Sequence, residues 1–336
     1  MENGSVSDKS DAGPEKRSQQ RFGRLPLTQD IRIRGHASNQ SWMKLIDTIN
    51  LIRWDAQDSA ENGSDVSDDE EISEASPVRV LTPSISYHNL ILRRYSTDID
   101  LTKYHPLPSY IPYLWYIYQE NLEPLIKVVH VPSVEAVFRD ARRNPANLTA
   151  AQEGLVFAIY YAAIISLDAE EVQTNFGTTK NNLLTQYRFA FEQALSKSNF
   201  IQTSNITILQ AFPIFLVVLR RHDESRYCWS IAGLLIHLAR GLGFHRDGIH
   251  LRMGPFETEM RRRIWWQLLI LDLRSSEELR TDLMISDSSH DTLMPSNIND
   301  AYISPDITEF PRPREGKSDC AVVVIRYETC SLNRRV

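Results

Sequence analysis

From Gly243 to Asp272 the chain reads GFHRDGIHLRMGPFETEMRRRIWWQLLILD, and this stretch indicates a helical protein. It predicts a capped turn followed by a long helix, because Gly243 suits a left-handed helix cap and Pro255 suits a first helical turn. Two pairs of opposite charge stand at i,i+4 spacing in the favourable order: Glu257 with Arg261, and Glu259 with Arg263. Each such pair stabilises a helix by about 0.2–0.5 kcal/mol.

The second half of this helix, from Ile264 to Leu273, is apolar except for Gln267 and Asp272. We therefore expect it to be enclosed by other helices. A buried carboxylate needs a polar partner. Arg274 lies only two residues from Asp272, a spacing that does not share a helix face, so we expect the partner of Asp272 to come from another helix.

Helical periodicity continues on both sides of this stretch, from about Ser86 onward. Thr149 begins a capping-box pattern, and Pro213 is expected to kink the helix that contains it. The other predicted helices are Tyr110–Glu120, Val134–Arg143, Thr149–Leu167, Asn181–Ser196, Asn205–Arg221 and Tyr227–Leu242. The last of these carries its apolar residues on one face and is expected to close at Gly241 and Gly243.

One short run, Val322–Ile325, is β-like, and it lies within Asp319–Arg335, which also reads as a helix. No series of alternating apolar and polar residues predicts a sheet. The predicted fold class is therefore all-α, with a multi-helix domain over residues 85–336.

Residues 1–84 differ in composition from the rest of the chain and are predicted to be mostly disordered. The tract 55–77 holds nine acidic residues, five serines and no Lys or Arg, so it carries −9 whereas the whole chain carries −6. Such a segment buries too little apolar surface to offset the entropy of ordering it. Within this region, Trp42–Trp54 has helical spacing. It is interpreted either as a transient helix or as a helix that docks onto a partner protein. Ser64 and Ser67 each precede Asp and are candidate phosphorylation sites, where a phosphate adds about −1.5 to −2 charge.

The 336-residue chain has the composition of a globular protein, with 42% hydrophobic and 24% charged residues. Its net charge gives no basic field of the kind that attracts nucleic acid. Its three cysteines are too few for a disulfide framework and favour a reducing compartment. Apolar runs such as Leu155–Leu167 are shorter than the roughly 18 residues of a spanning helix, and the polar N-terminus shows no secretory signal.

Several patterns that look like catalytic or metal sites lack the partners that such sites need. The triplet HRD at 245–247 is not followed by the Asn, and not accompanied by the Gly-rich loop, of a kinase. The sequence GLG at 241–243 lacks the third glycine of a dinucleotide site. The acidic run 68–71 is similar to paired acids that hold magnesium, but it lies in a Ser/Asp-rich tail rather than on an apolar helix. Neither the group Asp287, His290 and Asp291 nor the histidines at 237, 245 and 250 have metal-site spacing. The sequence therefore predicts no catalytic residue, no metal site and no cofactor, and the arginines at 261–263 are expected to pair with acidic side chains rather than with nucleic acid.

The order of these motifs resembles the fungal-specific transcription factor domain, which is the middle homology region of fungal binuclear zinc-cluster regulators. The resemblance covers roughly residues 87–330 and includes an early turn at His130-Val131-Pro132. The motif residues, for which the resemblance implies structural roles, are Gly243, His245, Arg246, Asp247, Glu259, Arg261, Arg262, Arg263, Trp265, Trp266, Asp272 and Pro295. The resemblance implies an all-helical, nuclear, non-catalytic regulatory domain.

Two departures from the family pattern bear on function. The family carries an N-terminal cluster of six cysteines that binds two zinc ions and reads DNA, whereas no cysteine precedes Cys228 here. The family's Gly-Arg-Pro turn is replaced by Leu279-Arg280-Thr281-Asp282. Because the chain ends within a predicted helix, we also expect a truncated gene product.

We therefore expect a nuclear transcription regulator that acts through contacts with other transcription regulators or co-regulators, a dimer partner among them. Direct DNA binding is not expected of this chain by itself. Two alternatives remain open, a truncated product of a DNA-binding zinc-cluster regulator and a metabolite-sensing helical module. The second rests on aromatic residues expected in the interior: Trp115, Tyr116, Trp229, Trp265 and Trp266.

Overall fold

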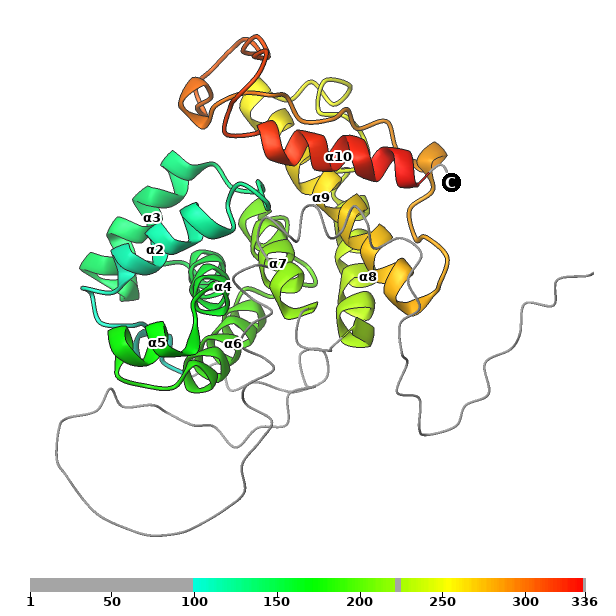
Figure 1. The fold of residues 1–336 in the computed structure, drawn as a ribbon. Coiled ribbons are helices and arrows are strands. Elements are labelled where there is room, and N and C mark those ends of the chain that lie inside the picture. The colour runs from blue at the N-terminus through cyan, green and yellow to red at the C-terminus, as the bar shows by residue number, and fades with distance from the viewer. Residues whose placement is uncertain (1–98, 221–224, 335–336) are drawn as a thin grey trace, which may run out of the picture. The chain divides into compact units, whose positions relative to one another are not determined.

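The computed structural model describes residues 99–220 and 225–334 (Figure 1). The chain divides into two units, residues 1–64 and 65–336, and every described residue belongs to the second unit. The predictions for residues 1–84 lie outside the described residues. They include the helix at Trp42–Trp54, the acidic tract 55–77 and the candidate phosphorylation sites Ser64 and Ser67.

All regular structure in the described residues is helical, which confirms the predicted all-α class. The α-helices are α2 (Ile111–Asn121), α3 (Val131–Arg143), α4 (Ala150–Ser166), α5 (Ala169–Phe176), α6 (Lys180–Lys197), α7 (Ile206–Leu219), α8 (Ser225–Gly241), α9 (Pro255–Leu279) and α10 (Ala321–Asn333). The short 3-10 turns are η1 (Leu101–Tyr104), η2 (Pro145–Asn147), η4 (Asp287–Ser289) and η5 (Asp300–Tyr302). None of these helices has both the length and the apolar character needed to cross a membrane.

Helix α4 is the central helix of one half of the described fold, where it packs against α2, α6 and α7 (Figure 1). It is buried on nearly all sides, as its apolar sequence predicts. Its start is the predicted capping box. The Thr149 hydroxyl accepts from the N–H of Gln152 at 3.3 Å, and the Gln152 side chain accepts from the N–H of Thr149 at 2.9 Å. These bonds satisfy donors that the first helical turn leaves without a partner.

Helix α9 has the corresponding place in the other half, where it packs against α7, α8 and α10. The chain leaves α8 through Gly243, which has a φ of 78°. The N–H of Phe244 donates to the carbonyl of Ala239 at 2.9 Å, and the N–H of Gly243 donates to the carbonyl of Arg240 at 3.0 Å. This is the Schellman arrangement that glycine favours. Gly241 is instead the last residue of α8, so the expectation that it also forms a left-handed cap is wrong.

The β-like run Val322–Ile325 is helical, because it lies in α10. The residues of α10 that face inward and are buried are Val323, Tyr327 and Cys330. Burial of this face outweighs the strand propensity of three consecutive valines.

Helix α5 is absent from the predicted set of helices. Its sequence nevertheless carries two helix signals, a capping box that begins at Asp168 and a left-handed Gly177 after its last residue.

The aromatic residues expected in the interior lie in different parts of the fold. Trp115 on α2 stacks on Phe138 of α3, with ring centroids 4.6 Å apart. Trp265 is fully buried in α9. Tyr116 is 56% exposed, so the expectation that it lies in the interior is wrong. Because α2 buries one face of an amphipathic helix, Trp115 and Tyr116 point in different directions.

Arg280 follows α9 with a φ of 54°, in the left-handed region that is unfavourable for a residue with a Cβ. Its side chain is exposed, and it stands where the family resemblance places a glycine-containing turn. We expect Arg280→Gly to raise the free energy of unfolding by about 1 kcal/mol, measured by urea denaturation. Gly243→Ala is the opposite change at the cap of α8 and should lower that free energy by a similar amount. Equal stability of all three proteins would contradict this explanation.

Candidate functional site: a strap held against helix α9

The connection between α9 and α10, residues 280–320, is an irregular segment that we call the strap. It returns from one end of α9 to the other (Figure 1), and its regular structure consists of the turns η4 and η5. Because such a segment has no ladder of backbone hydrogen bonds, its polar groups need partners elsewhere. Many of these partners are the motif residues identified from the sequence.

Asp247, in the turn before α9, holds the middle of the strap. Its fully buried carboxylate accepts two hydrogen bonds from the guanidinium of Arg262, at 2.8 and 2.9 Å. It also accepts from the backbone N–H of Leu293 at 2.9 Å and of Ile249 at 3.1 Å. Burial acts to raise the pKa of Asp247, but the hydrogen bonds from Arg262 and the two amides lower it below the ordinary value. The ionised carboxylate therefore joins α9, the preceding turn and the strap.

Trp266 and Thr292 make a second contact between α9, the turn and the strap. The indole N–H of Trp266 donates to the carbonyl of Leu293 at 2.9 Å. The hydroxyl of Thr292 donates to the carbonyl of Phe244 at 2.7 Å. Both bonds satisfy main-chain carbonyls of irregular segments.

Asp272 is fully buried and holds the start of the strap. Its two oxygens accept from the backbone N–H groups of Met284 and Ile285, each at 2.9 Å. Arg334, which caps α10, adds an ion pair at 3.2 Å. Asp272 therefore has its partner at the end of another helix, as expected, together with two strap amides that the sequence did not reveal. Arg274 forms an ion pair elsewhere, as its spacing requires.

Glu259 and Pro295 lie where the strap passes the first turns of α9. The buried carboxylate of Glu259 accepts from the N–H of Ser296 at 3.2 Å and pairs with Arg263 at 3.2 Å. Pro295 is buried, and because proline has no N–H its burial leaves no donor without a partner. At Pro295 and Ser296 the strap therefore packs against α9 with the N–H of Ser296 bonded to Glu259.

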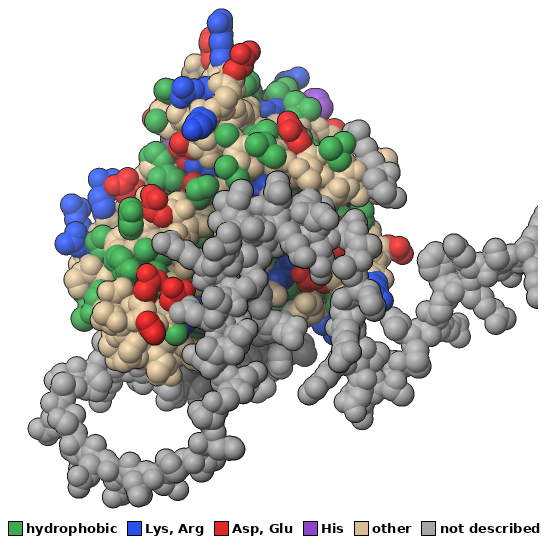
Figure 2. All heavy atoms as spheres, viewed as in Figure 1, with side chains coloured by type: hydrophobic (Ala, Val, Ile, Leu, Met, Phe, Trp, Pro, Cys, Tyr) green, Lys and Arg blue, Asp and Glu red, His purple; other side chains and the backbone are tan. Residues whose placement is uncertain are grey.

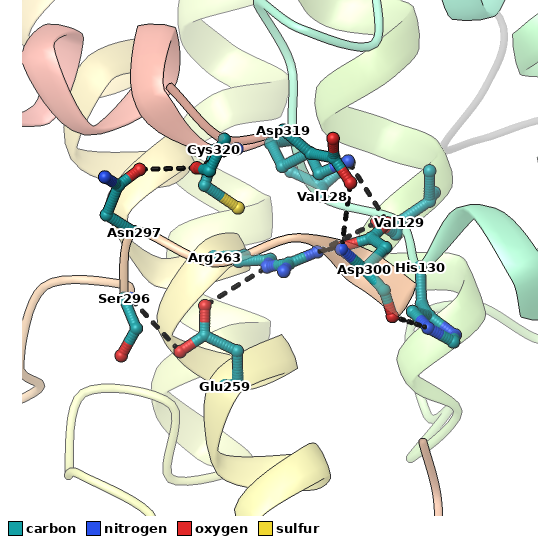
Figure 3. A network of polar contacts seen from close by, with 12 residues as sticks. Val128, Val129, His130, Glu259, Arg263, Ser296, Asn297, Asp300, Asp319 and Cys320 are labelled. Atoms are coloured by element: carbon teal, nitrogen blue, oxygen red, sulfur yellow. Dashed lines mark hydrogen bonds and ion pairs between the residues drawn. The ribbon is translucent and has the colours of Figure 1, made fainter. Parts of the chain in front are cut away.

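Arg263 lies among five buried ionisable side chains that we call the ionic cluster: Glu123, Lys127, Glu259, Arg263 and Asp300. Figure 3 shows Arg263 reaching from α9 between Glu259 and Asp300, and its Nη1 is 2.8 Å from the Asp300 carboxylate. Lys127, between α2 and α3, pairs with Asp300 at 3.1 Å and also with Glu123. Asp300 belongs to η5, so the cluster joins the strap to α9 and to the α2–α3 connection.

Further hydrogen bonds fix Asp300 in this position. Its carboxylate accepts from the N–H of Val131 at 2.9 Å, and its carbonyl lies 3.0 Å from Nε2 of His130. Its own N–H donates to Asp319, just before α10, at 2.9 Å. Burial acts to raise the pKa of Asp300, but Arg263, Lys127 and the amide lower it to about 2.

The three consecutive arginines pair with four different acidic side chains. Arg261 pairs with Glu257 at 3.1 Å and lies over the ring of Phe244. Arg262 pairs with Asp247, and Arg263 pairs with Asp300 and Glu259. Both pairs expected at i,i+4 spacing are therefore formed. The acidic partner of Arg262, Asp247, comes from the turn.

The remaining motif residues contact the same region. Trp265 lies with its ring centroid 6.2 Å from that of His245 and 5.6 Å from that of His290 in the strap. Arg246 is exposed and pairs with Asp291 of the strap at 3.1 Å. The described residues contain no group of three or more His, Cys, Asp or Glu side chains that could hold a metal ion.

Gly248, after Asp247, allows the turn to approach the first turn of α9. A Cβ built on Gly248 would lie 2.9 Å from Cβ and 3.0 Å from Cα of Thr258, closer than folded proteins allow. We expect Gly248→Ala to lower the free energy of unfolding by about 1–3 kcal/mol, measured by urea denaturation. Gly254→Ala is a matched control, because a Cβ there meets no atom within 4 Å. An equal loss in both variants would contradict the crowding at Thr258.

Comparison with known proteins gives one family match, to the model of the fungal specific transcription factor domain at residues 115–330. The aurofusarin cluster transcription factor of Gibberella zeae is 30% identical over 276 residues, which are 82% of this chain and 41% of that protein. The pyriculol/pyriculariol biosynthesis cluster transcription factor 1 of Pyricularia oryzae is 34% identical over 66% of this chain and 30% of its own length. A C6 finger domain transcription factor of Aspergillus niger is 29% identical over 86% of this chain and 37% of its own length.

The chain thus spans less than half the length of these relatives, and no solved structure matches it. The family match covers every motif residue from Gly243 to Pro295 that contacts the strap or the turn before α9.

Proposed function

The chain belongs to the family of the fungal specific transcription factor domain, and from this premise we propose that it is a nuclear regulatory module that acts through contacts with other transcription regulators or co-regulators. The relatives named above are transcription factors, which supports a role in transcription regulation. The family match over residues 115–330 is the observation on which the proposal rests.

The cysteines of this chain do not suit a zinc cluster. The chain has three cysteines, whereas a cluster of the C6 type needs six. All three, Cys228, Cys320 and Cys330, are buried in the described fold. Burial raises the pKa of the Cys330 thiol to about 11, which opposes the thiolate that zinc requires.

The outer face of α10 offers a surface for such a contact. Val322, Ile325, Thr329 and Leu332 follow one another at intervals of three, four and three residues, the spacing of a coiled-coil seam. Val322 is 46%, Ile325 60% and Leu332 64% exposed. Single exposed apolar residues are common on surfaces, but this spacing forms a stripe that an amphipathic helix fits. We propose a helix of a partner regulator as its occupant.

Affinity capture of the full chain from fungal nuclei tests the proposal. We expect mass spectrometry to identify transcription regulators or co-regulators, and we expect the double variant Ile325→Arg, Leu332→Arg to lose them. Both side chains are exposed, so the variant should keep the melting temperature of the wild type. Tyr116→Arg, at an exposed position of α2, is the matched control and should retain the partners.

Three outcomes would contradict the proposal: capture of no transcription component, unchanged capture by the double variant, or a fluorescent fusion that stays outside the nucleus. Electrophoretic mobility shift with added zinc addresses the alternative of direct DNA binding. Zinc-dependent binding of DNA by this chain would replace protein contact as its mode of action.

A further inference from the structure

The ionic cluster holds more carboxyl groups than cations. Lys127 and Arg263 face the carboxyl groups of Glu123, Glu259 and Asp300. Each of the five side chains is at most 7% exposed. An unbalanced charge is very unfavourable in such surroundings. A proton on one carboxyl group would leave two cations opposite two carboxylates.

Glu123 has the fewest contacts that favour its charged form. Asp300 has Lys127, Arg263 and a backbone amide, and Glu259 has Arg263 and a backbone amide. Within the part of the chain that the structure describes, Lys127 is the one cation in ion-pair contact with Glu123.

The other ionisable groups around Glu123 do not change this ranking. Tyr118 of α2 is a fully buried phenol that the charge of Glu123 disfavours in its ionised form. Asp300 of the strap repels an ionised Glu123, and Arg263 of α9 attracts it more weakly than Lys127 does.

We infer that Glu123 carries the proton that balances the ionic cluster, and that loss of this proton weakens the contact between the strap and the α2–α3 connection. An ionised Glu123 competes with Asp300 for Lys127 and repels Asp300 directly. Asp300 is the strap residue that accepts from Val131, so the strap loosens at this point. The inference does not depend on the proposed partner contact.

The pH range follows from the burial of Glu123. Burial raises its pKa from 4.5 to about 7, although Lys127 opposes the increase. The folded state therefore holds this proton more tightly than the unfolded state does. The resulting stabilisation is fully present below pH 4.5 and is lost as the pH rises to about 7.

Thermal denaturation of the full chain between pH 5.5 and pH 8 tests the inference. The melting temperature of the wild type should fall by about 5 °C or more over this range. Glu123→Gln, which cannot ionise, should lose most of this decrease. Glu120→Gln, at an exposed position at the end of α2, is the matched control and should keep it.

Amide hydrogen exchange gives a local measurement. Protection of the Val131 N–H should decline with pH in the wild type, after correction for intrinsic exchange, and should stay constant in Glu123→Gln. If this variant does not fold, carbon-13 NMR of the wild type should show a Glu123 carboxyl group with its midpoint near 7 rather than 4.5. A midpoint near 4.5, or the same pH dependence in wild type and Glu123→Gln, would overturn the inference.

Discussion

Replacing Arg263 by methionine is expected to lower the free energy of unfolding by about 3–5 kcal/mol. Arg263 is fully buried, and it pairs with both Asp300 and Glu259. Methionine has a similar length but no charge, so the variant leaves two buried carboxylates with Lys127 as the remaining cation of the ionic cluster. The carbonyl of Val129 also loses a donor. Urea denaturation at pH 7 measures the loss.

Arg261→Met is the matched control, because it makes the same change two residues away. The partner of Arg261, Glu257, has a side chain that is 51% exposed. A pair with one exposed partner contributes about 0–1 kcal/mol. Arg261→Met also removes the contacts of Arg261 with the Phe244 ring and the Leu242 carbonyl, so the control should lose some stability but clearly less than Arg263→Met. An equal loss in both variants would contradict the role of the ionic cluster.

A second measurement on Arg263→Met uses acid. In the wild type the pKa of Asp300 is lowered from 3.8 to about 2, chiefly by Arg263 and Lys127 against the effect of burial. A lowered acid pKa stabilises the fold above pH 3.8, and this contribution disappears as the pH falls toward 2. The variant should therefore lose less stability between pH 4 and pH 2 than the wild type does.

The parts of the site that sequence could predict are those set by local spacing. The pair of Glu259 with Arg263 spans one helical turn of α9, so its formation depends only on that helix. The capping box of α4 and the left-handed Gly243 are local in the same way. Together with the helical periodicity, these features indicated the all-α class, and Pro255 indicated the start of the long helix. Its end at Leu279 was not predicted.

The remaining contacts join residues that are distant in sequence. Arg263 and Asp300 are 37 residues apart, and Arg262 and Asp247 are 15 apart. Such pairs depend on the path of the strap, which has no periodicity because its backbone is irregular. Glu123 and Lys127 are four residues apart, a spacing that is visible in the sequence. The contact of Lys127 with Asp300 depends instead on the path of the strap.

Replacing Asp272 by alanine is expected to lower the free energy of unfolding by about 3–5 kcal/mol. The variant removes the acceptor of the Met284 and Ile285 amides and leaves Arg334, whose side chain is 2% exposed, without its buried carboxylate. Each buried donor without an acceptor costs about 1–3 kcal/mol. Urea denaturation measures the total, and hydrogen exchange should show the strap amides losing protection before those of α4.

Asp272→Asn gives a graded comparison. Its amide oxygen can still accept from one of the two strap amides, so its loss should fall between those of the wild type and Asp272→Ala. Asp282→Ala, at an exposed strap position ten residues later, controls for the removal of a carboxylate near the strap and should remain within about 0.5 kcal/mol of the wild type. Equal losses in Asp272→Asn and Asp272→Ala would show that the charge, not the two hydrogen bonds, holds the start of the strap. An Asp272→Ala protein as stable as the wild type would contradict the assignment of Asp272 as the residue that joins α9 to the strap and to α10.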